Sequence, residues 1–95
     1  MTDEERLEML KIDLGIRSTT AYDKRLTQYL QSAKADIERE GIIFPSDISI
    51  SDEQLIVMYA GWLWRKRSTG EGMPRMLRYA INNRLFAQKA GGGDG

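Results

Sequence analysis

The 95-residue sequence contains no cysteine and no histidine. Without cysteine, neither a disulfide framework nor a thiolate metal site can form, and a reducing compartment suits such a chain. Without either residue, the sequence lacks the commonest general base, the commonest metal ligand and the thiol nucleophile. These absences exclude most enzyme mechanisms, and we expect neither catalytic activity nor a cofactor or metal site.

Long hydrophobic runs are also missing. The longest, residues 55–64, is about half as long as a membrane-spanning helix. The acidic opening MTDEERLEML lacks the basic and then apolar layout of a secretory signal. We therefore expect a soluble chain that is neither secreted nor inserted in a membrane.

What the sequence does contain is typical of a folded helical domain. Hydrophobic residues make up 41% of the chain and charged residues 29%, and this length allows one modest core. Apolar residues recur at helical spacing in segments separated by short Gly or Ser breaks. We predict an all-α fold, a small bundle of about four helices, with one domain over residues 1–90 and a flexible Gly-rich tail over residues 91–95.

Capping signals give the expected helix bounds. Thr2 and Glu5 form a capping-box pattern for a first helix over residues 3–14. Residues 18–20 offer a cap for a second helix, which ends before Gly41 and which we expect to be the longest. Ser51, with a glutamine three residues later, is the expected start of a third helix. The fourth helix is expected from Pro74 to about residue 89.

The third helix differs from the others because its run LIVMYAGWLW is apolar on nearly every side. Such a helix needs several neighbours. At about 100° per residue, Trp62 and Trp64 point in opposite directions. Trp64 is therefore expected to face outward, with aromatic surface left over once a simple core is filled.

Charge is divided unevenly along the chain although the total is zero. Residues 1–53 carry 7 basic and 12 acidic side chains and residues 54–95 carry 7 basic and 2 acidic ones, so the net charges are −5 and +5. Three readings are open. The halves neutralise each other within one fold, the basic half faces a nucleic acid, or the halves are complementary surfaces that join identical copies head to tail.

The C-terminal positive charge surrounds one helix–link–helix unit. Arg65 and Arg67 lie at the end of the third helix, and the fourth carries a polar stripe, flanked by Tyr79 and Phe86, that consists of Arg75, Arg78, Asn82 and Lys89. This stripe is read as an ordinary solvated face, as contacts to phosphates that are blind to sequence, or as a surface that pairs with an acidic neighbouring subunit.

Arg84 falls on the apolar side of the fourth helix, opposite the solvent. An unpaired charge there would be costly. We predict that Arg84 pairs with a carboxylate of the acidic first half or of a neighbouring subunit.

Two further chemical possibilities are weak. Carboxylate catalysis is formally open to Asp3, Glu4, Glu5 and Glu8, but these residues lie in or near an exposed first turn, where they favour the helix dipole. The GEG link at residues 70–72 lacks the Lys-Ser/Thr ending of a phosphate-binding loop.

Residues 57–89, VMYAGWLWRKRSTGEGMPRMLRYAINNRLFAQK, resemble the C-terminal part of head–tail connector proteins of tailed bacteriophages. The aromatic and basic WLWRKR, the glycine link and MPRMLRYAINNRLF carry the resemblance. The earlier segment YDKRLTQYLQSAKADIEREGI is similar to the second helix of the same family.

The resemblance implies a structural adaptor in a virion or an integrated prophage, without catalytic activity or cofactor. Copies would form a homo-oligomeric ring between the portal and the tail completion or stopper proteins, and DNA would pass through it. The expected location is the virion, and the host cytoplasm during assembly. The candidate interface consists of Trp64, Arg65, Arg67, Arg75, Arg78, Tyr79, Arg84, Phe86 and Lys89.

The main alternative is a small helical DNA-binding regulator that uses the third and fourth helices. Two features disfavour it. The link of about five residues is looser than the tight turn of a helix-turn-helix, and LIVMYAGWLW offers no polar recognition face.

Overall fold

A computed structural model describes residues 1–16 and 18–92. Four helices follow one another: α1 (Asp3–Leu14), α2 (Asp23–Arg39), α3 (Ile50–Thr69) and α4 (Arg75–Gly92). The described part of the chain contains no strand. The predicted all-α fold, a small bundle of four helices, is therefore confirmed.

The start and end of α1 follow its sequence signals. The Thr2 hydroxyl accepts a hydrogen bond from the Glu5 backbone, and the Glu5 carboxylate accepts one from the Thr2 backbone, which completes the predicted capping box. The Thr2 hydrogen bonds lower the pKa of the Glu5 carboxyl. Gly15 closes the helix in the left-handed region, at φ 73°.

Two predictions about α2 were wrong: its first residue, and that it would be the longest helix. It begins at Asp23, three residues beyond the expected cap, because the Thr19 hydroxyl accepts the Ala21 backbone N–H in a turn instead of capping the helix. It has 17 residues, so it is shorter than α3 with 20. The predicted stop is confirmed, since Gly41 follows the helix at φ 110°. The buried side of α2 consists of Leu26, Leu30, Ala33 and Ile37.

α3 is the central helix of the fold. Its cap is Ser49, whose hydroxyl accepts the Asp52 backbone N–H, and not Ser51 as predicted. The predicted need for several neighbours is confirmed, because α3 packs against α1, α2 and α4. The buried residues of its apolar run are Leu55, Ile56, Val57, Tyr59, Ala60, Gly61, Trp62 and Leu63.

The link over residues 70–74 leads into α4, which begins at Arg75, one residue after the predicted start at Pro74. α4 is longer than predicted and runs to Gly92, so the first two residues of the predicted tail are helical. The rest of that tail, residues 93–95, lies outside the described residues.

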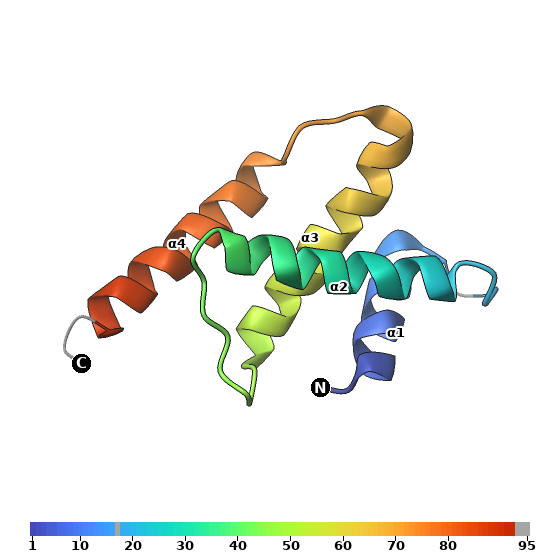
Figure 1. The fold of residues 1–95 in the computed structure, drawn as a ribbon. Helices are drawn as coiled ribbons and strands as arrows, with labels where there is room; N and C mark the ends of the chain where they lie inside the picture. Colours follow the sequence, from blue (N-terminus) through green and yellow to red (C-terminus); the bar gives the residue numbers. More distant parts are fainter. Residues whose placement is uncertain (17, 93–95) are drawn as a thin grey trace.

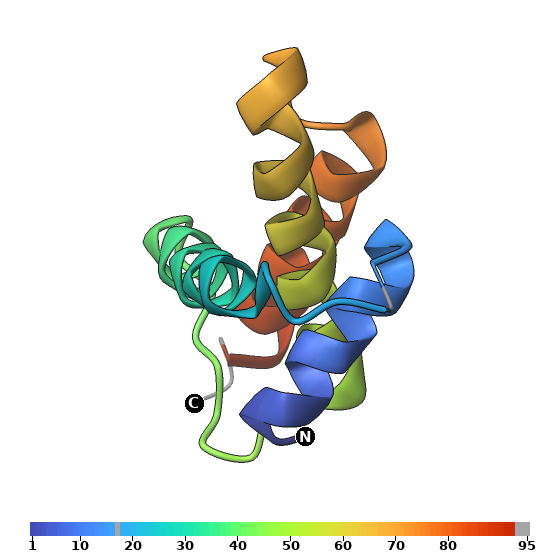
Figure 2. The same cartoon turned by 90° about the vertical axis from the view of Figure 1, so that its right-hand side faces the viewer.

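The helices form a flat, elongated body with extents of 47 × 29 × 17 Å. α2 crosses α3 in front, and α4 and α1 lie on opposite sides of α3 (Figure 1). In the perpendicular view α2 is seen nearly end-on, and the long arm of α3 rises above it toward the link (Figure 2). α4 packs chiefly against α3, so much of its circumference is left open. No described helix is long and apolar enough to cross a bilayer.

Candidate assembly interface

The circumference of α4 is divided into three arcs. At about 100° per residue, the first arc faces α3 and contains Leu77, Ile81, Arg84, Leu85 and Gln88. The second is the predicted polar stripe of Arg75, Arg78, Asn82 and Lys89. The third contains Met76, Tyr79, Asn83, Phe86, Ala87 and Ala90. We call this third set the α4 stripe.

The α4 stripe is apolar apart from one asparagine and faces solvent. Met76 is 76% exposed, Tyr79 55% and Phe86 76%. Single exposed apolar residues are common, but here three large ones share one side of a helix. Met76 and Tyr79 are neighbours there, and Phe86 lies two turns further along, beyond the exposed Asn83. Exposed apolar side chains gathered on one face are a candidate interaction surface.

Arg84 lies on the arc of α4 that faces α3, and it binds α4 to the rest of the fold. Its guanidinium binds Asp52 through Nε–Oδ1 at 2.8 Å and Nη2–Oδ2 at 3.2 Å, and Nη2 also donates to the Ile43 carbonyl at 3.0 Å. Asp52 is 5% exposed. The predicted pairing of Arg84 with a carboxylate of the first half is confirmed. Arg84 is consequently a structural residue of the fold and not part of an exposed interface.

Gln88 extends this attachment by one helical turn. Its side-chain carbonyl accepts the Ile43 backbone N–H at 2.8 Å, and its Nε2 donates to the Gly41 carbonyl at 2.9 Å. Arg84 and Gln88 together hold α4 against the connection between α2 and α3. The rotation of α4 about its own axis is thereby set, and the α4 stripe is directed away from the core.

Arg78 is the second predicted interface residue with a partner inside the chain. Its guanidinium binds both carboxylate oxygens of Glu40, at 3.0 and 3.2 Å. The hydrogen bonds from Arg78 lower the pKa of the Glu40 carboxyl. Two C-terminal cations, Arg78 and Arg84, are therefore neutralised by the acidic half within one copy of the chain.

Trp64 is not the outward anchor that the sequence suggested. Its ring meets Tyr22 and Tyr29 edge-on, with centroids 5.3 and 6.1 Å away, and the Arg67 guanidinium lies 3.8 Å from its centroid. Trp64 and Trp62 do point apart, since Trp62 packs against Tyr59 instead. The helical spacing correctly predicted that Trp64 and Trp62 point apart, but Tyr22, just before α2, and Tyr29 on α2 pack against the Trp64 ring.

The predicted interface therefore separates into two groups. Arg75, Tyr79, Phe86 and Lys89 share the exposed surface of α4, with Arg78 at its edge. Trp64, Arg65 and Arg67 lie in the C-terminal part of α3, where the Trp64 ring contacts Tyr22, the residue just before α2. The sequence analysis missed Met76, although its spacing to Tyr79 and Phe86 on a helix could have indicated the patch.

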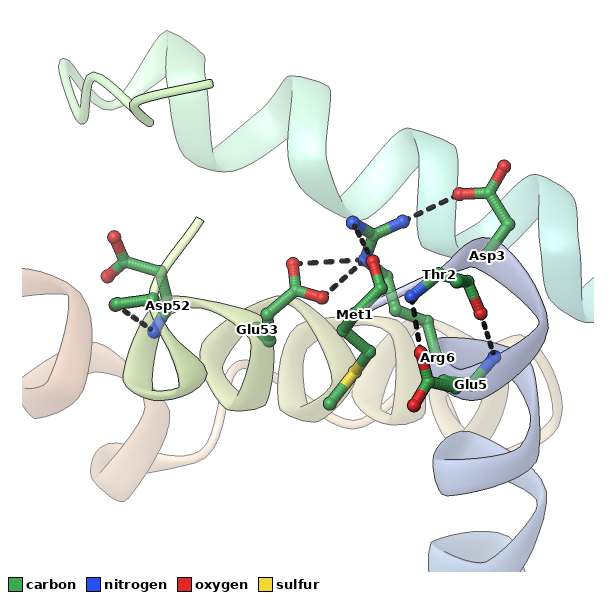
Figure 3. Close-up of polar contacts among 8 residues, drawn as sticks. Met1, Thr2, Asp3, Glu5, Arg6, Asp52 and Glu53 are labelled. Atoms are coloured by element: carbon green, nitrogen blue, oxygen red, sulfur yellow. Dashed lines mark hydrogen bonds and ion pairs between the residues drawn. The ribbon is translucent and has the colours of Figure 1, made fainter. Parts of the chain in front are cut away.

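Two buried carboxylates at the start of α3 were also missed. Asp52 receives Arg84 from α4, and the adjacent Glu53, 1% exposed, receives Arg6 from α1 at 2.9 and 3.0 Å. Figure 3 shows the Arg6 guanidinium between Glu53 and Asp3. These neighbouring acids hold the helices on opposite sides of α3.

Residues 1–16 and 18–92 include several exposed acidic side chains. No group of three or more potential metal ligands occurs in this part of the chain. The acids Asp3 and Glu5 are engaged with Arg6 and the helix cap. The most distinctive surface is the α4 stripe.

Comparisons with protein-family models, with curated proteins and with solved structures each found no match for this chain.

Proposed function

We propose that this protein is a self-assembling structural module without enzymatic activity, and specifically a head–tail connector that forms a ring between phage portal and tail completion proteins. The single observation that supports self-assembly most strongly is the exposed α4 stripe. The connector identity rests on the resemblance of residues 57–89. The proposed location is the virion, and the host cytoplasm during assembly.

Solvent exposure of the α4 stripe carries a free-energy cost that a partner would remove. Burial of a Phe or Met side chain is worth about 1.5–3 kcal/mol relative to full exposure. Phe86 and Met76 are both about three-quarters exposed. Aromatic anchors surrounded by charges are typical of interfaces, in which the anchor supplies affinity and the charges set orientation.

The basic side chains next to the stripe suit an electrostatic role in such an assembly. Arg75 and Lys89 are exposed and belong to no ion pair of the described residues. They are available to acidic groups of a neighbouring copy or to phosphates of DNA in a channel. Contacts to phosphate carry no base-sequence information.

The rival function, a sequence-specific DNA-binding regulator, has less support from the geometry. The central part of α3, residues 52–63, is largely buried, so this apolar stretch offers no polar face to a DNA groove. α4 presents the large apolar side chains of Met76 and Phe86 on the same helix as its exposed Arg75, whereas base-edge readout uses bidentate polar groups.

Native mass spectrometry over a concentration series, with and without duplex DNA, tests the proposed function. The proposal predicts closed oligomers larger than a dimer that form without DNA. A protein that stays monomeric into the millimolar range, or that forms only dimers and takes up DNA, would refute it.

A further inference from the structure

An open groove with a volume of about 470 Å³ lies along α1. Its apolar wall consists of Leu7, Ile12 and Ile16, and Ile12 is 49% exposed. Its polar lining is acidic on balance, with Glu4, Glu8 and Asp23 against Lys11. Since Asp23 already pairs with Lys11 at 2.8 Å, Glu4 and Glu8 dominate the charge that the groove presents to solvent.

We propose that the α4 stripe of one copy docks in this α1 groove of the next copy, with Phe86 against the apolar wall and Lys89 beside Glu4 and Glu8. The inference rests on the proposed self-assembly and names the two surfaces that meet. The occupant of the groove is therefore a second copy of this chain.

Charge complementarity supports this pairing. Glu4 and Glu8 are four residues apart on one helix face, where like charges repel each other, so a cation between them is favourable. Lys89 is three residues after Phe86, so it lies on the same side of α4, at the edge of the stripe. A single docking event would bury the phenyl ring and bring the ammonium group to the two carboxylates.

The positions of the two surfaces also suit a head-to-tail contact. α4 and α1 lie on opposite sides of α3 (Figure 1), so one copy can offer its stripe to one neighbour and its groove to another at the same time. A contact between two different surfaces propagates from copy to copy, and it closes into a ring when the rotation between copies allows.

The competing arrangement is a symmetric pairing of two α4 stripes. In an antiparallel pair related by a two-fold axis, each flank of one helix meets the same flank of the other. That would bring Arg75 of one copy toward Lys89 of the other, and like charges across an interface are unfavourable. The acidic groove avoids this repulsion.

Site-directed disulfide formation tests the pairing directly, because the chain has no cysteine of its own. Ala90→Cys places a thiol on the stripe one turn from Phe86, and Ile12→Cys places one in the groove. Each variant is oxidised alone and in an equimolar mixture, and the oligomeric state of the wild type is measured in parallel. Met58→Cys, on an exposed part of α3, is the matched control partner for Ala90→Cys.

The proposal predicts a mixed Ala90→Cys/Ile12→Cys disulfide at a yield at least several-fold above the Met58→Cys control. Charge reversal provides a second readout: Lys89→Glu and Glu8→Lys should each weaken self-association about tenfold, and their combination should restore most of it. A dominant Ala90→Cys homodimer, or an assembling wild type without mixed disulfide or charge-reversal rescue, would overturn the docking inference and leave self-assembly intact. A wild type that stays monomeric throughout would instead refute the proposed function.

Discussion

The guanidinium of Arg84 on α4 binds the buried carboxylate of Asp52 on α3 through two hydrogen bonds. This one pair has two consequences. It neutralises the charge of Arg84, which lies on the apolar side of α4. It also holds α4 in an orientation in which Phe86, on a different arc of the helix, points to solvent. The residues that stabilise the fold and the residues of the proposed interface therefore lie on separate arcs of α4. Substitutions can test the two roles separately.

Arg84→Met should lower the free energy of unfolding by about 3–5 kcal/mol, because it leaves the Asp52 carboxylate buried without its cation. Urea denaturation followed by circular dichroism measures this. Arg75→Met is the matched control, since Arg75 is an exposed arginine on the same helix, and its effect should stay within about 0.5 kcal/mol. Equal effects of the two substitutions would contradict a structural role for Arg84.

Trp64→Ala should destabilise the monomer itself by about 2 kcal/mol, because it removes the edge contacts with Tyr22 and Tyr29. Any loss of assembly should therefore follow the loss of folding in thermal melts. A Trp64→Ala protein that melts like the wild type but no longer assembles would show that the tryptophan is an intermolecular anchor after all.

The ion pair between Arg78 and Glu40 should give a small pH dependence of stability at acidic pH. The arginine lowers the folded-state pKa of Glu40 below its ordinary value, so the stabilisation is present above the unfolded-state pKa and is lost as pH falls through the folded-state pKa. The pair is near the surface, so its worth is only about 0.5 kcal/mol. Wild type and Glu40→Gln should therefore differ in stability at pH 7, and the difference should shrink as pH falls below the ordinary glutamate pKa of about 4.3.

Binding of the basic stripe to DNA, if observed, should be insensitive to base sequence. The polar stripe of α4 holds three cations, Arg75, Arg78 and Lys89, and one amide, Asn82, a composition suited to phosphates or carboxylates. Gel-shift titrations with two unrelated duplexes should give the same affinity within about threefold, and that affinity should fall steeply with salt. Strong discrimination between the duplexes at physiological salt would favour the regulator.

Much of the fold could be predicted from the sequence because helix formation depends on local spacing and caps. The capping box at Thr2, the stop at Gly41 and the four helices all follow from nearest neighbours along the chain. The sequence predicted that Arg84 pairs with a carboxylate, because a charge on an apolar face must be neutralised. Local spacing does not show that this carboxylate is Asp52.

The parts that could not be predicted depend on contacts between distant segments. Arg6 and Glu53 are 47 residues apart, and only the packing of α1 on α3 brings them together. The shielding of Trp64 likewise depends on where the start of α2 lies. Ser49 and Ser51 near the start of α3 could each have capped it, and local spacing did not indicate that Ser49 is the cap.

The most direct test of the central claim compares the wild type with Phe86→Gln by light scattering over a concentration series, at low and at high salt. We expect the wild type to form oligomers larger than a dimer that loosen with salt before the domain unfolds. Phe86→Gln should remain monomeric at concentrations at least about tenfold higher, with unchanged melting. Ile50→Gln, which removes an equally exposed apolar side chain from the start of α3, should assemble like the wild type. Equal association of wild type and Phe86→Gln, or a wild type that never associates, would contradict the account.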